Sequence, residues 1–184
     1  MLVPVLLFIV GLLFLIKGGD WFVDGASALA RRFHLPELLN GATVVSIGTT
    51  LPEVMVSTMS AVSGHGEIAY GNAIGSVICN SALIAAITSL VKGCSDLSLG
   101  NIVGANVFNL VLVSGVSVTL APFTVPQSST LFSINSSLVL EIPVMLAVMM
   151  IMTLPALKRG KLSRAQGVIL LCIYAAFCAI QFTM

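Results

Sequence analysis

The residues best suited to chemistry form one polar stripe in an otherwise apolar stretch. In GATVVSIGTTLPEVMVSTMS (41–60), polar side chains recur at steps of three and four, which places them on one face of a helix: Thr43, Ser46, Thr50, Glu53, Ser57 and Ser60. Glu53 lies near the middle of this stripe. A carboxylate in hydrocarbon costs about 3 kcal/mol or more without a partner. No Lys or Arg lies at a comparable depth in the later apolar segments, so a bound cation is the simplest partner and a proton is the alternative.

The residues beside Glu53 are hard oxygen donors. Pro52 has no N–H, so the carbonyl of Gly48, four residues back, loses its usual helical partner. Thr49 and Thr50 add two hydroxyl groups. Carboxylate, hydroxyl and carbonyl oxygens suit calcium or sodium rather than zinc or copper. The pattern predicts a cation site, and a protonated glutamate at a helix kink is the other interpretation.

The composition indicates an integral membrane protein. Hydrophobic residues make up 58% of the 184 residues and charged residues only 8%, against about 25% charged residues in soluble domains. This argues against a soluble enzyme, a nucleic-acid-binding protein and a disordered chain. No nucleophile–base pair and no nucleotide-binding loop occurs either, so we expect no enzymatic activity and no cofactor.

Apolar runs separated by breakers predict an all-α membrane bundle of about six transmembrane helices in one domain, residues 1–184. The first helix runs from residue 1 through GASALARRF, and the others cover about 37–63, 67–91, 97–120, 138–157 and 163–183. No Lys or Arg precedes the first apolar run, so a helix is expected there rather than a cleaved signal peptide. Glu141 and Pro143 suit the first turn of the fifth helix.

The cations predict a single orientation in the membrane. Seven of the eight Lys and Arg residues fall in three loops on one side, namely Arg31, Arg32, Lys92, Lys158, Arg159, Lys161 and Arg164. Under the positive-inside rule that side is cytoplasmic, so both termini are expected outside. The eighth cation, Lys17, lies in the first helix near Asp20 and Asp24, for which structural ion pairs are the favoured interpretation.

An internal repeat spans the third and fourth predicted helices. GEIAYGNAIGSVICN (66–80) and SDLSLGNIVGANVFN (95–109) share acidic-x-x-x-Gly-Asn-x-x-Gly-small-x-x-x-Asn. The two copies lie on consecutive helices and so cross the membrane in opposite directions, as in many secondary transporters. Helix packing explains the GxxxG glycines. It does not explain the asparagines, which should face the bundle interior or water because polar groups facing lipid are costly.

These segments resemble the calcium/cation antiporter superfamily, in particular bacterial inner-membrane sodium/calcium exchangers. GATVVSIGTTLPE followed by GNAIGSVICN is similar to the first α-repeat, LSLGNIVGANVFN to the later part of the second, and LEIPVMLAVM to a span near the family's C-terminus. The resemblance implies ten helices in two inverted halves, with calcium and sodium bound between them and alternating access. Matched position by position, it implies six ion ligands: Thr49, Thr50, Glu53, Ser76, Asn80 and Asn109.

The sequence also departs from the family pattern. The second Gly-Thr-Ser-x-Pro-Glu motif is missing, and Ala105 stands where a serine ligand is expected. Residues 1–92 resemble the first three helices of the family, and 93–184 resemble its last three. The chain thus resembles a remnant of the inverted-repeat fold in which about four middle helices are absent.

The expected function is secondary active exchange of calcium, or a related cation, for sodium or protons across the bacterial inner membrane. The partners expected are lipid and small inorganic cations, with a homo-oligomer or a complementary chain as further possibilities, and no nucleic acid. A transport-inactive paralogue or assembly subunit is the alternative, because one fixed carboxylate remains where the family has two. A proton-coupled carrier of another solute, with Glu53 as the proton site, is a third interpretation.

Overall fold

The computed structural model of the chain describes residues 2–91, 96–125, 130–131 and 134–183. It is helical throughout apart from one short hairpin. The elements are α1 (Leu2–Arg32), α2 (Glu37–Asn40), η1 (Gly41–Val45), α3 (Ser46–Val62), α4 (Gly66–Ile78), η2 (Cys79–Ile84), α5 (Ala85–Val91), α6 (Asp96–Phe108), η3 (Asn109–Val113), α7 (Ser114–Leu120), β1 (Thr130–Leu131), β2 (Ile134–Asn135), η4 (Ser137–Glu141), α8 (Ile142–Arg159) and α9 (Arg164–Thr183), where η marks a π-helical segment. The helical runs agree closely with the predicted ones.

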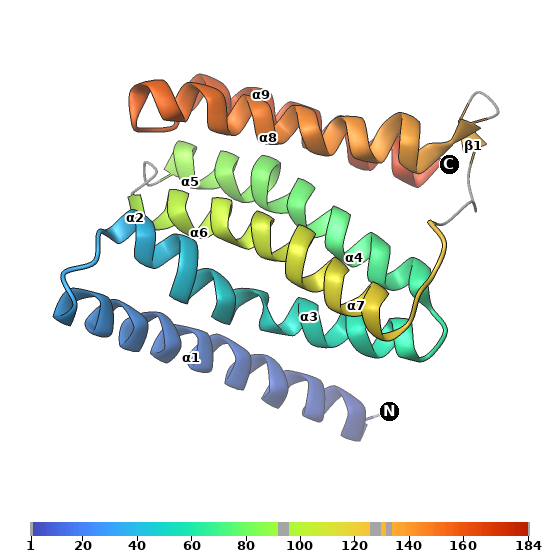
Figure 1. Cartoon of the computed structure of the whole chain (residues 1–184), viewed down its shortest axis with the longest axis horizontal. Coiled ribbons are helices and arrows are strands. Elements are labelled where there is room, and N and C mark those ends of the chain that lie inside the picture. The colour runs from blue at the N-terminus through green and yellow to red at the C-terminus, as the bar shows by residue number, and fades with distance from the viewer. Residues whose placement is uncertain (1, 92–95, 126–129, 132–133, 184) are drawn as a thin grey trace.

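Five of the described helical runs are long and apolar enough to cross a membrane: 2–32, 66–91, 96–120, 137–159 and 164–183. The run from α2 through α3 is not among them, although it lies within the same bundle (Figure 1). Its polar stripe lowers its hydropathy below that of its neighbours. The prediction of about six helices therefore holds for the helical runs, and five of these have the composition of a span.

The helical runs are stacked in layers (Figure 1). The α8–α9 hairpin covers one face of the bundle, where α9 contacts α5 and η2, and α8 contacts α4. The runs α4–α5 and α6–α7 form the middle, and α3 packs against both of them. On the opposite side α1 touches only the α2–α3 run among the described elements with substantial contacts. Nearly all of α1 is exposed as a result.

The hydrophobic core lies between the middle runs and the α8–α9 hairpin. Small side chains of η2 and α5 meet larger ones of α8 and α9, and the buried cluster includes Ala82, Ala85, Ala86, Ile102, Val148, Met152 and Leu170. Alanines on one side allow the helices to approach closely, while Met and Leu fill the space on the other. The polar stripe of α3 lies on the other side of this core, next to α6.

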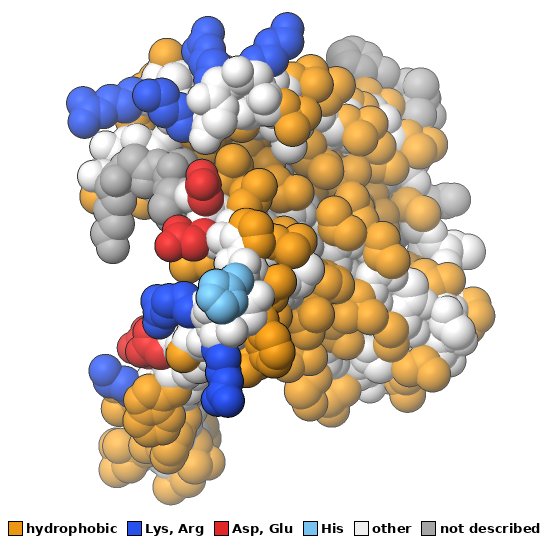
Figure 2. Space-filling view, turned by 60° about the vertical axis from the view of Figure 1, so that its left-hand side comes forward, with side chains coloured by type: hydrophobic (Ala, Val, Ile, Leu, Met, Phe, Trp, Pro, Cys, Tyr) orange, Lys and Arg blue, Asp and Glu red, His pale blue; other side chains and the backbone are white. Residues whose placement is uncertain are grey.

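The ends of the bundle differ in charge. The Leu2 end of α1 and the Thr183 end of α9 lie at one end (Figure 1). The opposite end carries the exposed Lys and Arg side chains, which Figure 2 shows gathered along its edge: Arg31, Arg32, Lys158, Arg159, Lys161 and Arg164. Lys92 lies outside the described residues. The loop after α1 and the turn between α8 and α9 therefore lie at the same end of the bundle (Figure 1).

The GxxxG pairs of the two repeats behave differently. A Cβ atom on Gly100 would lie 2.1 Å from the carbonyl oxygen of Leu38, and one on Gly104 would lie 2.4 Å from that of Ala42. The backbones of α6 and the α2–η1 segment therefore touch directly. Gly71 and Gly75 of α4 have no described atom within 4 Å of such a Cβ. Packing explains the second glycine pair but, within this chain, not the first.

This difference predicts opposite effects of two alanine substitutions. Gly104→Ala should lower the free energy of unfolding by about 1–3 kcal/mol, because the new methyl group meets backbone that cannot move aside. Gly75→Ala is the matched control on the other repeat and should leave stability unchanged or slightly higher, because Ala favours helix over Gly. Thermal unfolding of the purified protein in detergent measures both. Equal destabilisation by the two variants would contradict the described packing of α6.

Candidate functional site

Part of the polar stripe along α3 faces the inside of the bundle. Ser46, Thr50 and Ser57 are at most 2% exposed. Glu53 is half-buried, and its Oε2 atom is buried without a hydrogen-bond partner among the described residues. An ionised carboxylate oxygen in such a place needs a counter-charge. The described residues thus leave one strong acceptor unsatisfied at the centre of the stripe.

Two asparagines hold α3 on either side of this carboxylate. Asn72 of α4 donates from Nδ2 to the backbone carbonyl of Glu53 at 3.2 Å and to Ser57 Oγ at 2.8 Å. Asn101 of α6 accepts at Oδ1 from Ser46 and from Thr49, both at 3.3 Å. These two asparagines occupy the same position in the two sequence repeats. The repeat therefore clamps the stretch of α3 that contains Pro52 and Glu53.

The neighbouring threonines lie on different sides of α3. Thr50 is 2% exposed and belongs to the buried stripe. Thr49 is exposed and lines a groove of about 670 Å³ beside α1. Thr50 therefore faces the bundle interior, whereas Thr49 faces the groove. The single hydroxyl hydrogen of Thr49 has two acceptors at the same distance, Asn101 Oδ1 and the carbonyl of Ser46, both at 3.3 Å.

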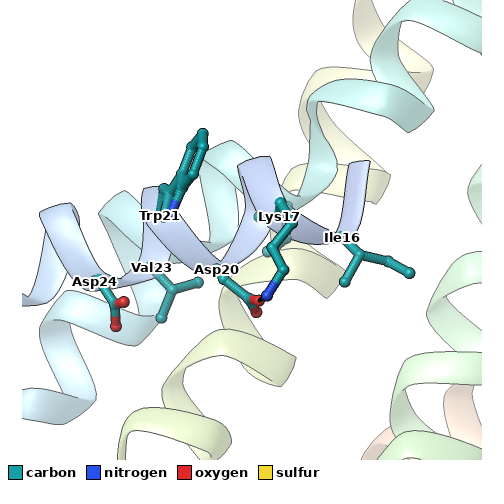
Figure 3. Close-up of a pocket in the computed structure, with 8 residues that line it drawn as sticks. Ile16, Lys17, Asp20, Trp21, Val23 and Asp24 are labelled. Carbon is teal, nitrogen blue, oxygen red and sulfur yellow. Dashed lines mark ion pairs between the residues drawn. The ribbon is translucent and has the colours of Figure 1, made fainter. Parts of the chain in front are cut away.

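Charged side chains of α1 form the far wall of this groove, as Figure 3 shows. Lys17 Nζ and Asp20 Oδ2 are 3.8 Å apart, and both side chains are largely exposed. The predicted ion pair is therefore present for Asp20. For Asp24, which also lines the groove, no ion pair occurs among the described residues.

Phe22 is a residue near the site that sequence reasoning missed. A Cβ atom on Gly48 would lie 2.0 Å from its ring, so the absence of a side chain at Gly48 is what allows the ring to approach α3. Gly48 is also the residue whose carbonyl Pro52 leaves without its helical donor. The ring is 39% exposed. A glycine one turn before the proline was the only available signal, and it did not identify the aromatic partner.

The remaining predicted ligands lie on the helices around α3. Asn109 begins η3, is 1% exposed, and its Oδ1 has no partner among the described residues. Ser76 of α4 is partly buried, and both α4 and η3 pack against α3. Asn80 is also partly buried, but it lies in η2, which packs against α6, α8 and α9 rather than α3. Elements carrying five of the six residues therefore adjoin one another.

Asn106 completes the buried polar network and was not singled out from the sequence. It is 1% exposed and donates from Nδ2 to Ser81 Oγ at 2.6 Å, which ties α6 to η2. Like Asn109, it leaves its Oδ1 buried without a partner among the described residues. Two of the three buried or partly buried asparagines on the α6–η3 run thus present a free acceptor oxygen.

Two π-helical segments coincide with this region. Asn80 lies within η2 and Asn109 opens η3. Such segments are frequent at functional sites, because the wider turn disturbs the regular hydrogen-bond ladder. Groups of three or more Asp, Glu, His or Cys side chains are absent from the described residues. Any cation here would be held by one carboxylate with amide, hydroxyl and carbonyl oxygens.

Comparison with known proteins shows similarity along both halves of the chain. The family model for sodium/calcium exchanger proteins matches residues 3–93 and again residues 82–183. Inner membrane protein YrbG of Escherichia coli is 46% identical over 90 residues, which are 49% of this chain and 28% of that protein. The sodium/calcium exchanger MaX1 of Methanosarcina acetivorans is 39% identical over 85 residues, 46% of this chain and 24% of that protein. The chain thus aligns with about a quarter of the length of these relatives.

A solved structure shares the fold. The sodium-calcium exchanger NCX_Mj superimposes with a TM-score of 0.71 at 17% identity, covering 94% of this chain and 96% of that one. At this identity the match concerns the fold alone.

The clamp on α3 can be tested through its hydrogen bonds. Asn72→Ala should lower the free energy of unfolding by about 1–3 kcal/mol, because the buried Ser57 hydroxyl loses its donor and the Glu53 carbonyl loses a bond that ties α3 to α4. Thr119→Ala is the control, since it removes a local, exposed bond to the carbonyl of Gly115. Chemical or thermal unfolding in detergent compares the two. A loss for Thr119→Ala as large as that for Asn72→Ala would speak against a clamp.

Proposed function

The chain belongs to the sodium/calcium exchanger protein family, and on that premise we propose that it exchanges calcium, or a related cation, for sodium or protons across the bacterial inner membrane. The observation that carries the proposal is the buried, unpartnered Oε2 of Glu53. No Lys or Arg of the described bundle pairs with it. A bound cation can neutralise a carboxylate in apolar surroundings while the carboxylate stays ionised.

The surrounding atoms suit a hard cation. Thr50 contributes a buried hydroxyl, Asn109 a buried amide oxygen with no partner among the described residues, and Gly48 a carbonyl without its helical donor. Oxygen donors of this kind favour calcium and sodium over softer metals. We assign six residues as ion ligands: Thr49, Thr50, Glu53, Ser76, Asn80 and Asn109. Of these, Asn80 lies on η2, which has no substantial contact with α3.

Exchange follows from competition for one carboxylate. A dehydrated cation replaces its water by Glu53 and the neighbouring oxygens, and a second cation can bind only after the first has left. The groove beside α1 reaches Thr49 from one side, so it provides a water-accessible approach to that face of α3. The helices that slide or rock during the cycle would be those with the least packing, which here means α1.

The orientation and the partners belong to the same proposal. The end of the bundle with the exposed Lys and Arg side chains faces the cytoplasm, which puts both termini outside. The open glycine face of α4 leaves room for a further helix, and its counterpart on α6 is filled by backbone. A complementary chain would supply such a helix, along with the second carboxylate that the family motif contains, whereas a second copy in the same orientation lacks that motif.

A transport-inactive paralogue or assembly subunit is the second candidate. It is favoured by one observation, namely that Glu53 is the only Asp or Glu among the residues assigned to the site. A divalent ion held there would keep an uncompensated positive charge. The two candidates differ in flux but not in fold, so transport must be measured directly.

Substitution of the carboxylate tests the proposal. In everted membrane vesicles, radioactive calcium uptake driven by a sodium or proton gradient should be abolished by Glu53→Gln, which keeps the shape of the side chain and removes its charge. Glu67→Gln is the control, because Glu67 is an exposed carboxylate one helix away that pairs with His65. Immunoblotting of the vesicles confirms equal insertion.

Flux that persists in Glu53→Gln would overturn the assignment of the site. Absence of flux in the unaltered chain, with the protein present in the membrane, would favour the transport-inactive alternative.

A further inference from the structure

A second carboxyl group, Glu141, has the same unusual surroundings as Glu53. Glu141 closes η4, four residues into the helical run 137–159. The prediction of a first-turn position is correct for Pro143, which is among the first two residues of α8, but it is wrong for Glu141, because η4 extends the helical run by one more turn toward the N-terminus. The carboxyl group therefore lies inside the run rather than at its end.

Three helical runs meet at this carboxyl group. Gln181 of α9 donates from Nε2 to Glu141 Oε1 at 3.1 Å. Tyr70 of α4 lies beside Glu141 and Ser137. Ser137 itself is 2% exposed. The cluster of Glu141, Tyr70, Ser137 and Gln181 is called the outer cluster below, because it lies at the end of the bundle that holds both termini.

The outer cluster contains two buried polar oxygens, Glu141 Oε2 and the Tyr70 hydroxyl, and neither makes a hydrogen bond of good geometry to the described residues. The Tyr70 hydroxyl is the polar group that lies toward both Glu141 and Ser137. Pro143 cannot donate to a carbonyl of the preceding turn, at Leu138 or Val139, which leaves a backbone acceptor close by. Carboxylate, phenol, serine hydroxyl and backbone carbonyl are all hard oxygen ligands.

No protein cation is placed to neutralise this carboxylate. The described Lys and Arg side chains lie at the opposite end of the bundle, apart from Lys17 on α1, which packs on the other side. The charged groups at this end of α4 are Glu67 and its partner His65, which directly precedes the helix, and their side chains are 58% and 62% exposed, respectively. They form their own pair at 3.4 Å and are not part of the outer cluster.

We propose that the outer cluster is a second cation site, distinct from Glu53, that binds a monovalent hard cation such as sodium between α4, η4 and α9. The charge decides the valence: one carboxylate is neutralised by one monovalent ion, whereas a divalent ion would leave a net positive charge in apolar surroundings. The bound ion would tie α4 to the α8–α9 hairpin. The site does not depend on the ion that Glu53 takes.

Direct sodium binding to the purified full-length chain tests this site. Radioactive sodium is bound in a scintillation proximity assay to Glu53→Gln protein, in which the first site is removed. We expect this variant to retain sodium binding and the double variant Glu53→Gln/Glu141→Gln to lose it. Glu53→Gln/Glu67→Gln is the matched control with an exposed carboxylate at the same end, and it should bind like Glu53→Gln alone.

A gentler substitution guards against misfolding of the double variant. Tyr70→Phe in the Glu53→Gln background keeps the ring and removes one ligand oxygen, so it should weaken sodium binding by about tenfold, the ratio that corresponds to about 1.4 kcal/mol. Size-exclusion chromatography establishes that each variant is folded.

Three outcomes would overturn the second site. Sodium binding that is lost in Glu53→Gln alone would place all binding at the first site and leave the proposed function standing. Sodium binding unaffected by Glu141→Gln or Tyr70→Phe would place the ion elsewhere. Absence of sodium binding together with an infrared band of a protonated carboxyl group that Glu141→Gln removes would show that a proton satisfies the cluster instead.

Discussion

The structure depends on how polar atoms are satisfied where water is scarce. The α3 helix carries a carboxylate, a run of hydroxyls and a proline that interrupts its own hydrogen bonds, and it lies inside a bundle of apolar helices. Asn72 and Asn101, one on each side of Glu53, form hydrogen bonds with side-chain and backbone atoms of this helix. They do not provide a partner for the Oε2 atom of the Glu53 carboxylate. Local geometry and proposed function therefore have the same physical origin.

The sequence repeat acquires a structural meaning from these contacts. Equivalent asparagines of the two copies reach the same helix from two neighbours that run in opposite directions. The equivalent glycines do not behave alike, because Gly100 and Gly104 touch the backbone of the α2–η1 segment while Gly71 and Gly75 face open space. The two repeats therefore place their asparagines equivalently, but different parts of the bundle surround their glycines.

The charged side chains of the bundle differ both in how deeply they are buried and in the end of the bundle at which they lie. Exposed cations gather at one end of the bundle, where they can reach water and lipid head groups. Two carboxyl groups, Glu53 and Glu141, are held inside helical runs, each with one buried oxygen that has no partner among the described residues. The exposed pairs Lys17–Asp20 and His65–Glu67 show the contrast, because each of these carboxylates has a partner side chain at the surface. Burial without a partner, rather than acidity alone, distinguishes the two candidate ion sites.

Much of this protein could be predicted from the sequence, because membrane helices are specified by local composition. The helical runs, the polar stripe with Glu53 at its centre, the repeat and the grouping of the cations all follow from the order of residues. Contacts between helices do not, since close approach depends on which faces meet. Only the tertiary structure decided that Thr49 and Thr50 face different surroundings, that Phe22 rests on Gly48, and that Asn106 binds Ser81. Likewise, the sequence indicates only that Glu141 lies near the start of a helix. The tertiary structure shows that one of its oxygens is buried near Tyr70, because burial depends on neighbours that are distant in sequence.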